Sequence, residues 1–250
     1  MKWTQVLFGL CCLCFWGILT WSRFAGQHGD SWGSLLSAQA WLEHGSPELS
    51  AYQDKVDLYA SQFYRTERGV YYFFPPFSAF LSVPFVALAR LAGWQMWDAQ
   101  AEGLLQRQIC VLALCSLLAM LAYGYRCLMN DRTALAVAFA TICGGSLLGS
   151  LGGALNSQVP AIIFMTWAQV LFLRERYGTG DWKGWQIGCL LAFSYLCRPT
   201  GAIWALAALA YVSWRKPRQL PASLLSLALV VGLYSLACWH FFDTPIHRYY

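Results

Sequence analysis

Asp30 is the first residue whose type and position could serve catalysis. It stands between Gly29 and Ser31, shortly after an apolar run over Val6–Trp21. A carboxylate just beyond a membrane segment can act as a general base at the membrane surface. The same side chain could instead cap a helix, because aspartate accepts hydrogen bonds from the free backbone N–H groups at helix starts.

Arg198 is the second such residue, and its position predicts a charge below the membrane surface. It separates the apolar stretches Trp185–Cys197 and Gly201–Trp214. Each stretch is shorter than the roughly 20 residues that cross a bilayer. A charge at that depth is costly unless it meets water, a carboxylate or an anionic ligand. We therefore expect an outward-opening cavity at Arg198, although an ion pair with Asp30 would satisfy the same arginine.

Composition indicates an all-α integral membrane protein. Hydrophobic residues make up 58% of the chain and charged residues only 12%. A soluble domain would need a more polar surface. The net charge of +5 comes from basic residues scattered among loop ends, with no tract that could follow a phosphate backbone, so no nucleic-acid partner is expected.

The apolar runs predict seven transmembrane helices in a single membrane domain, residues 1–250. The first span covers residues 6–22 and is retained, because no small-x-small cleavage site follows it. Residues 23–106 form a long external loop, residues 107–242 hold six further spans, and residues 243–250 form an external tail. Basic residues fall in alternate loops, which places the N-terminus in the cytoplasm. The six further spans are expected at Ile109–Tyr125, Ala134–Leu155, Val159–Leu173, Trp185–Cys197, Gly201–Trp214 and Ala222–Phe242.

The long loop is expected to carry interfacial helices. Hydrophobic spacing predicts an amphipathic helix over Ser31–His44, capped by Asp30 and ended by Gly45. The apolar run Phe77–Gly93 is interrupted by prolines and is expected to dip into the membrane without crossing it. The stretch Tyr52–Arg68 has no clear period and is expected to be irregular or partly helical.

Three groups of residues resemble the GT-C glycosyltransferases that use polyprenyl-phosphate donors, in the branch of protein O-mannosyltransferases and lipid A aminoarabinose transferases. They span most of the chain and occur in the same order as in that family. The groups are Gly29-Asp30-Ser31 with Ser37–Gly45, Tyr72–Pro76 with Pro84-Phe85, and Arg198-Pro199-Thr200.

The resemblance implies a glycosyltransferase that moves a sugar from a polyprenyl-phosphate donor to a lipid, glycan or protein acceptor outside the membrane, with inversion at the anomeric carbon. It implies that Asp30 is the catalytic carboxylate. The leaving phosphate needs a cation nearby, for which we expect Arg198 first, then His247 and Arg248. No cofactor is required, and a divalent cation is possible but not indicated. The expected location is the bacterial cytoplasmic membrane, with the active site on its outer side.

Four other loop residues could contact the acceptor, namely Glu43, His44, Tyr71 and Tyr72. Each has a second interpretation. Glu43 could bind a divalent cation, as could Asp54 and Asp57, or these acids could be solvated, and the tyrosines could be interface anchors. Gly145, Gly149 and Gly153 could line a lipid groove, but their spacing is more typical of helix packing.

Two departures from the family pattern leave a rival hypothesis open. Ser31 stands where many members carry a second acid, and members usually continue beyond the position of Tyr250 with further spans, so a C-terminal part is expected to be absent here. The rival is a non-catalytic protein that binds the polyprenyl lipid, a flippase or an accessory subunit. Such a protein would keep Arg198 but would not need Asp30.

Overall fold

The computed structural model describes residues 2–21, 31–58, 60–144 and 158–244. Within these ranges the chain forms α-helices, two short 3-10 helices and one β-hairpin. The α-helices are α1 (Lys2–Trp21), α2 (Ser34–His44), α3 (Pro76–Leu91), α4 (Ala99–Tyr125), α5 (Asp131–Gly144), α7 (Gln158–Arg176), α8 (Gly184–Cys197), α9 (Gly201–Arg215) and α10 (Leu220–Phe242).

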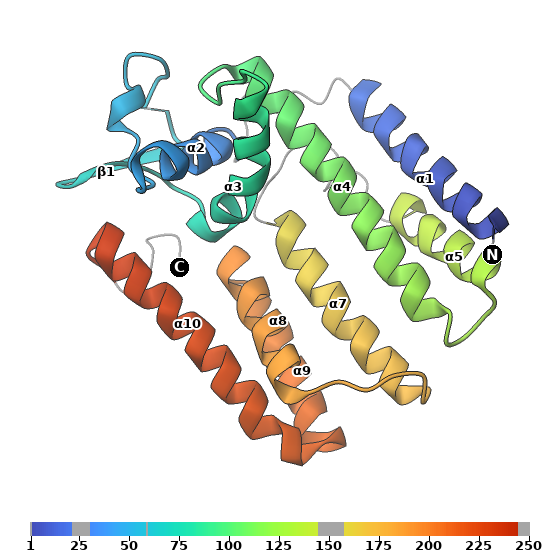
Figure 1. The fold of residues 1–250 in the computed structure, drawn as a ribbon. Helices are drawn as coiled ribbons and strands as arrows, with labels where there is room; N and C mark the ends of the chain where they lie inside the picture. The colour runs from blue at the N-terminus through green and yellow to red at the C-terminus, as the bar shows by residue number, and fades with distance from the viewer. Residues whose placement is uncertain (1, 22–30, 59, 145–157, 245–250) are drawn as a thin grey trace.

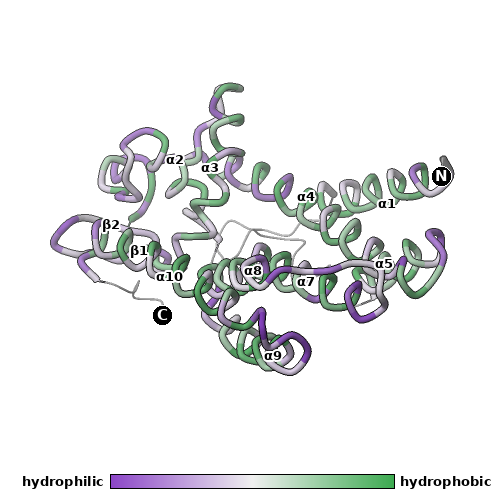
Figure 2. Tube along the Cα trace, turned by 60° about the horizontal axis from the view of Figure 1, so that its bottom comes forward, coloured by the Kyte–Doolittle hydropathy of each residue, from purple (hydrophilic) through white to green (hydrophobic). Residues whose placement is uncertain are grey.

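The long helices lie side by side, and a smaller layer covers one end of them (Figure 1). This layer contains α2, α3 and the hairpin of β1 (Phe63–Thr66) and β2 (Gly69–Tyr72). One buried hydrophobic cluster joins α1, α4 and α5 to the layer, and a second joins α7, α8 and α9. Hydrophobic residues dominate the middle of the helices, whereas hydrophilic residues gather at their ends and in the loops (Figure 2).

Three helices of the described residues are long and apolar enough to cross a membrane: Trp3–Thr20, Ala99–Tyr125 and Pro217–Phe242. This indicates a membrane protein, but the seven expected spans are not confirmed. For two of these spans the reason is length: α8 has 14 residues and α9 has 15. At 1.5 Å per residue, each covers only about 21 to 23 Å. The expectation that these two helices are short is confirmed.

Helix α4 begins earlier than its expected start at Ile109. It starts at Ala99, and the Asp98 side chain caps it by accepting a 2.9 Å hydrogen bond from the Gln100 N–H. Glu102 and Gln106 fall within the expected loop, but both are buried: Glu102 accepts from Leu35 N of α2, and Gln106 donates to the Ser31 carbonyl just before α2. The first two turns of α4 therefore belong to the contact between the bundle and the layer.

The helix expected over Ser31–His44 exists but differs in its start and its surroundings. It begins at Ser34 with Gly33, not Asp30, in the N-cap position, and Gly45 ends it as predicted. The expected amphipathic surface helix is wrong for its first half, because every residue over 34–40 is buried. Its N-terminal amides are satisfied from another helix: the Glu102 carboxylate accepts hydrogen bonds from Gly33 N (3.0 Å) and Leu35 N (3.1 Å).

The stretch Tyr52–Arg68, expected to be irregular or partly helical, contains β1, and β2 follows directly after it. Phe63 pairs with Tyr72 and Thr66 with Gly69, in antiparallel register. The Arg68 side chain at the tip forms an ion pair with Asp243 and donates a 2.9 Å hydrogen bond to the His240 carbonyl. The hairpin is thereby attached to the end of α10, a contact about 170 residues away that no local sequence pattern encodes.

Glycines bring α8 and α10 into direct contact. A Cβ atom on Gly184 would collide with the Gln219 carbonyl, and one on Gly188 would collide with the Ser223 carbonyl and the Ser226 hydroxyl. This spacing of small residues four apart is a common way for membrane helices to approach closely. The glycines at 145, 149 and 153, which suggested helix packing or a lipid groove, lie outside the described residues.

Candidate functional site

Arg198 lies at the turn between α8 and α9, at the end of α8 that faces the layer (Figure 1). Its backbone is extended, with φ −152° and ψ 121°. Pro199 favours this conformation, because a proline ring disfavours helical geometry in the residue before it. Gly201 N then donates to the Arg198 carbonyl at 2.9 Å, which closes the turn from which α9 begins.

The Arg198 side chain is half-buried and points to the first residue of α7. When the Gln158 amide is oriented with its oxygen toward the guanidinium, that oxygen accepts from Arg198 Nη1 and Nη2 at 2.7 and 3.0 Å. In the described part of the chain, no acidic side chain forms an ion pair with Arg198. An amide satisfies hydrogen bonds but leaves the positive charge uncompensated, so the site favours an anion.

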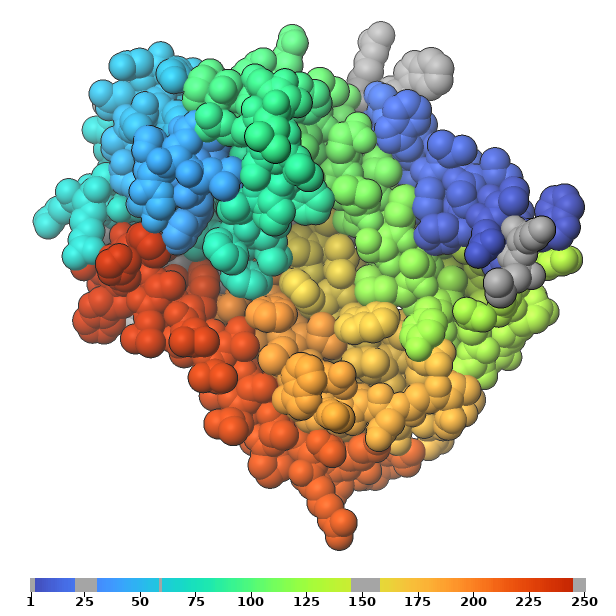
Figure 3. Space-filling view, in the orientation of Figure 1, coloured from blue at the N-terminus to red at the C-terminus, as the bar shows by residue number. Residues whose placement is uncertain are grey.

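An apolar groove of about 480 Å³ lies beside the same end of α8. It runs between α2, α3, α8 and α10, and Leu196, two residues before Arg198, forms part of its wall. Figure 3 shows the face on which α3 and α10 meet. The groove is lined mainly by aromatic and aliphatic side chains, among them Trp41, Phe77, Phe80, Phe193, Leu233 and Phe241.

A second apolar cavity of about 210 Å³ lies on the other side of an aromatic partition. Val159 and Pro160, the neighbours of Gln158, line it together with residues of α3 and α4. The partition is made by Phe193, whose ring stacks on Phe77 at 5.6 Å and contacts Phe164 at 5.3 Å. Leu196, two residues before Arg198, thus lines the groove, and Val159 and Pro160, which follow Gln158, line the second cavity.

Three of the expected site residues lie outside the described residues: Asp30, His247 and Arg248. Their roles therefore stay predictions. Gln158 is the residue that the sequence interpretation missed. It follows a loop without basic residues, and no local pattern signals that its side chain meets Arg198, which is 40 positions away in the chain.

Glu43 is the centre of a polar network within the layer. It forms an ion pair with Arg90 of α3 and accepts a hydrogen bond from the Tyr52 hydroxyl. Gln39 donates a 2.9 Å hydrogen bond to its Oε1, and the His44 ring nitrogen lies 3.8 Å from its Oε2. The acid expected to be either solvated or a substrate contact is thus engaged by four side chains of the protein.

Burial governs the chemistry of the tyrosines in this layer. It raises the pKa of Tyr52 from 10.0 to about 12, so the phenol stays protonated and keeps donating to Glu43. Burial also raises the pKa of Tyr71, whose ring packs on Phe242 at 5.0 Å. Tyr72 is only 4% exposed and packs on Phe74. Neither Tyr71 nor Tyr72 offers an open face for stacking on a sugar.

Asp54 and Asp57, the other acids considered for a cation or acceptor, are exposed. Among the residues that the structure describes, no three His, Cys, Asp or Glu side chains come together as a possible metal site. The expectation that the chain requires no metal therefore stays a prediction.

No protein-family model matches this chain, and no curated protein or solved structure matches it.

Proposed function

We propose that the chain is a membrane glycosyltransferase of the GT-C type. It would transfer a sugar from a polyprenyl-phosphate donor to an acceptor on the extracytoplasmic face of the membrane. The observation that carries this proposal is Arg198, a half-buried arginine without an acidic partner among the described residues, which lies two residues along the chain from Leu196 in the wall of an apolar groove. A donor of this class combines the two parts that such a site would bind, an anionic phosphate and an apolar chain.

The distribution of polarity supports a lipid over a soluble phosphate. The groove of about 480 Å³ is lined by aromatic and aliphatic side chains, and α10 on one side of it has an apolar outer surface. A lipid chain could enter from the bilayer alongside α10, whereas a soluble sugar phosphate would gain nothing from these walls. Anchored in this way, the phosphate would meet Arg198 at the level where the apolar helices end.

The proposed reaction is a single displacement. An acceptor hydroxyl or amine attacks the anomeric carbon, the carbon–oxygen bond to the phosphate breaks, and the polyprenyl phosphate leaves. Asp30 takes the proton that the acceptor loses. Arg198 offsets the negative charge that develops on the departing phosphate, with His247 and Arg248 as further candidates. The proposed location is the cytoplasmic membrane of a bacterium, with the N-terminus inside the cell.

The test is sugar transfer from labelled polyprenyl-phosphate sugars by membranes that contain equal amounts of wild-type chain or Asp30→Asn. We expect transfer by the wild type and at least a hundredfold loss in Asp30→Asn, the order of magnitude of general-base catalysis. Glu67→Gln is the matched control, because it removes an exposed acid from the same loop and should leave transfer unchanged.

The rival hypothesis of a polyprenyl-lipid carrier shares the site at Arg198 but not the reaction. It predicts donor binding without transfer by either chain, and that result would replace the transferase proposal. Equal transfer by the wild type and Asp30→Asn would support a transferase but remove Asp30 from its mechanism.

A further inference from the structure

A third cavity lies far from Arg198. It is found where the N-terminal end of α1 meets the C-terminal end of α4 and the start of α5 (Figure 1). Its volume is about 600 Å³, which is within the usual range of small-molecule pockets, about 300 to 1,000 Å³. Phe8, Ala119 and Leu135 supply apolar walls, while Thr4 and the pair Arg126–Asp131 supply polar groups. The cavity therefore combines an apolar interior with a charged rim.

The rim carries both signs of charge side by side. Arg126 Nε donates to Asp131 Oδ1 at 2.7 Å and Arg126 Nη2 donates to Oδ2 at 3.2 Å. Both side chains are about half exposed. Among the described residues Nη1 of Arg126 has no hydrogen-bond partner, and each Asp131 oxygen keeps a further lone pair. The pair can thus donate to one group of a ligand and accept from another.

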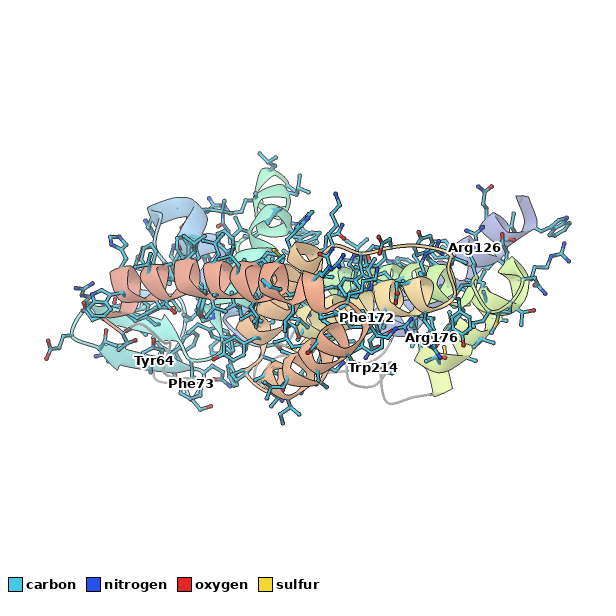
Figure 4. All side chains as sticks on the ribbon, turned by 90° about the horizontal axis from the view of Figure 1, so that it is seen from below. Tyr64, Phe73, Arg126, Phe172, Arg176 and Trp214 are labelled. Carbon is cyan, nitrogen blue, oxygen red and sulfur yellow. The ribbon has the colours of Figure 1, made fainter. Side chains whose placement is uncertain are left out.

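Asp131 is not needed to cap the helix that it begins. The Asn130 side chain does this, since its Oδ1 accepts from Thr133 N at 3.0 Å and from the Thr133 hydroxyl at 3.1 Å. The Asp131 carboxylate faces the cavity and Arg126. Figure 4 shows Arg126 at the end of the molecule opposite Tyr64 and Phe73 of the layer, so this cavity is separate from the proposed donor site.

We propose that this cavity binds one glycerophospholipid whose headgroup carries a primary amine, such as phosphatidylethanolamine. The phosphate accepts from Nη1 of Arg126, the ammonium donates to Asp131, and an acyl chain lies against Phe8, Ala119 and Leu135. A lipid is the natural occupant because α1 and α4 are both long and apolar enough to span a bilayer, and the cavity lies at their ends, where headgroups gather.

The charge pair also predicts which headgroup binds. A primary ammonium can donate hydrogen bonds to Asp131, whereas a quaternary choline cannot. A headgroup with only a negative charge would gain from Arg126 but would be repelled by Asp131. The expected order is therefore phosphatidylethanolamine above both phosphatidylcholine and phosphatidylglycerol, by about two- to fivefold, as expected for a half-exposed ion pair.

The experiment measures lipids that remain bound to the purified full chain by native mass spectrometry, with the three phospholipids of identical acyl chains in equimolar competition. The variants are Asp131→Asn and Arg126→Gln, and Arg218→Gln is the control because it removes an exposed arginine from another loop. Thermal unfolding is measured for each, since a purely structural ion pair would change the melting temperature and leave the headgroup preference unaltered.

The expected result is one retained phosphatidylethanolamine on the wild type and on Arg218→Gln. Asp131→Asn should lose the preference for ethanolamine over choline, and Arg126→Gln should bind all three lipids more weakly. Three results would overturn the proposal: no retained lipid on the wild type, a wild-type preference for phosphatidylglycerol, or an ethanolamine preference that survives in Asp131→Asn.

Discussion

Glu43 connects α2 to α3 and to the loop that contains Tyr52. How far its side chain is buried distinguishes a structural role from a role in binding the acceptor. As a structural centre it would hold the layer together; as an acceptor contact it would have to be accessible. Its side chain is 23% exposed and that of its partner Arg90 is 31% exposed. A pair buried to this degree is costly to break, because the remaining charge loses its partner without regaining full hydration.

Glu43→Gln is therefore expected to destabilise the protein by about 1 to 3 kcal/mol. Thermal unfolding in detergent measures this. Glu67→Gln is the matched control, because Glu67 is an exposed acid in the same layer, and it should change stability by less than about 0.5 kcal/mol. A variant that loses sugar transfer at unchanged stability would contradict the structural role and point to acceptor binding.

Tyr52 makes the stability of the layer depend on pH. Its pKa is raised from 10.0 to about 12 by burial, so the folded state holds this proton more tightly than the unfolded state does. The stability that the neutral phenol contributes is complete below about pH 10 and is lost as pH rises from about 10 to about 12.

We expect the wild type to lose more stability than Tyr52→Phe between about pH 9 and about pH 11, because the variant has no phenol to ionise. The variant itself should be less stable by about 1 to 2 kcal/mol at neutral pH, since it lacks the hydrogen bond to Glu43. Melting temperatures across this pH range test both points, and parallel curves for the two proteins would refute the role given to Tyr52.

At the level of the elements, the sequence predicted the helices best where hydrophobicity alone defines them. Helices α7, α8, α9 and α10 lie within a few residues of the expected bounds. The failures are at places where a distant partner decides the structure. The early start of α4 depends on Glu102 meeting the amides of α2, and the hairpin is attached to α10 through Arg68.

In the candidate site too, the features that depend on local hydrophobicity were predicted, and those that depend on distant partners were not. The position of Arg198 between two short helices followed from the lengths of the apolar runs, and the structure confirms those lengths. The partner Gln158 and the groove beside α8 could not be predicted, because both arise from the packing of segments far apart in the sequence.

The contact between α8 and α10 gives a prediction at this scale. Gly188→Ala should destabilise the protein by about 1 to 3 kcal/mol, because the added methyl group would collide with backbone of α10. Gly232→Ala is the control within α10: nothing lies near its Cβ position, so it should be neutral or stabilising by up to about 1 kcal/mol. Unfolding in detergent compares them, and equal effects would show that the two helices do not pack as described.

For the whole molecule, the outer surface of α10 indicates contact with lipid. Leu225, Leu229, Leu233 and Leu236 are each at least 60% exposed and recur every three or four residues. A soluble protein rarely leaves such a continuous apolar stripe uncovered. The stripe lies on α10, which is also one of the three candidate spans. The exposure of its leucines and the length and hydropathy of the helix therefore agree.

Leu229→Lys, near the middle of α10, should reduce membrane insertion of this helix, at a cost of about 2.5 to 3.5 kcal/mol. Leu229→Ala keeps the position apolar and should insert nearly as well as the wild type. A glycosylation reporter placed after α10 measures the inserted fraction. Full insertion of the lysine variant would mean that Leu229 faces protein or water and that the stripe is not a lipid surface.

The most direct test of the account is binding of a polyprenyl phosphate to the purified chain, compared with the polyprenol of equal length. The groove predicts binding of both, and Arg198 predicts that the phosphate binds more tightly by about tenfold. Arg198→Gln should reduce the phosphate to the affinity of the alcohol, while Arg218→Gln should leave it unchanged. Equal affinity of the wild type and Arg198→Gln for the polyprenyl phosphate would contradict the account.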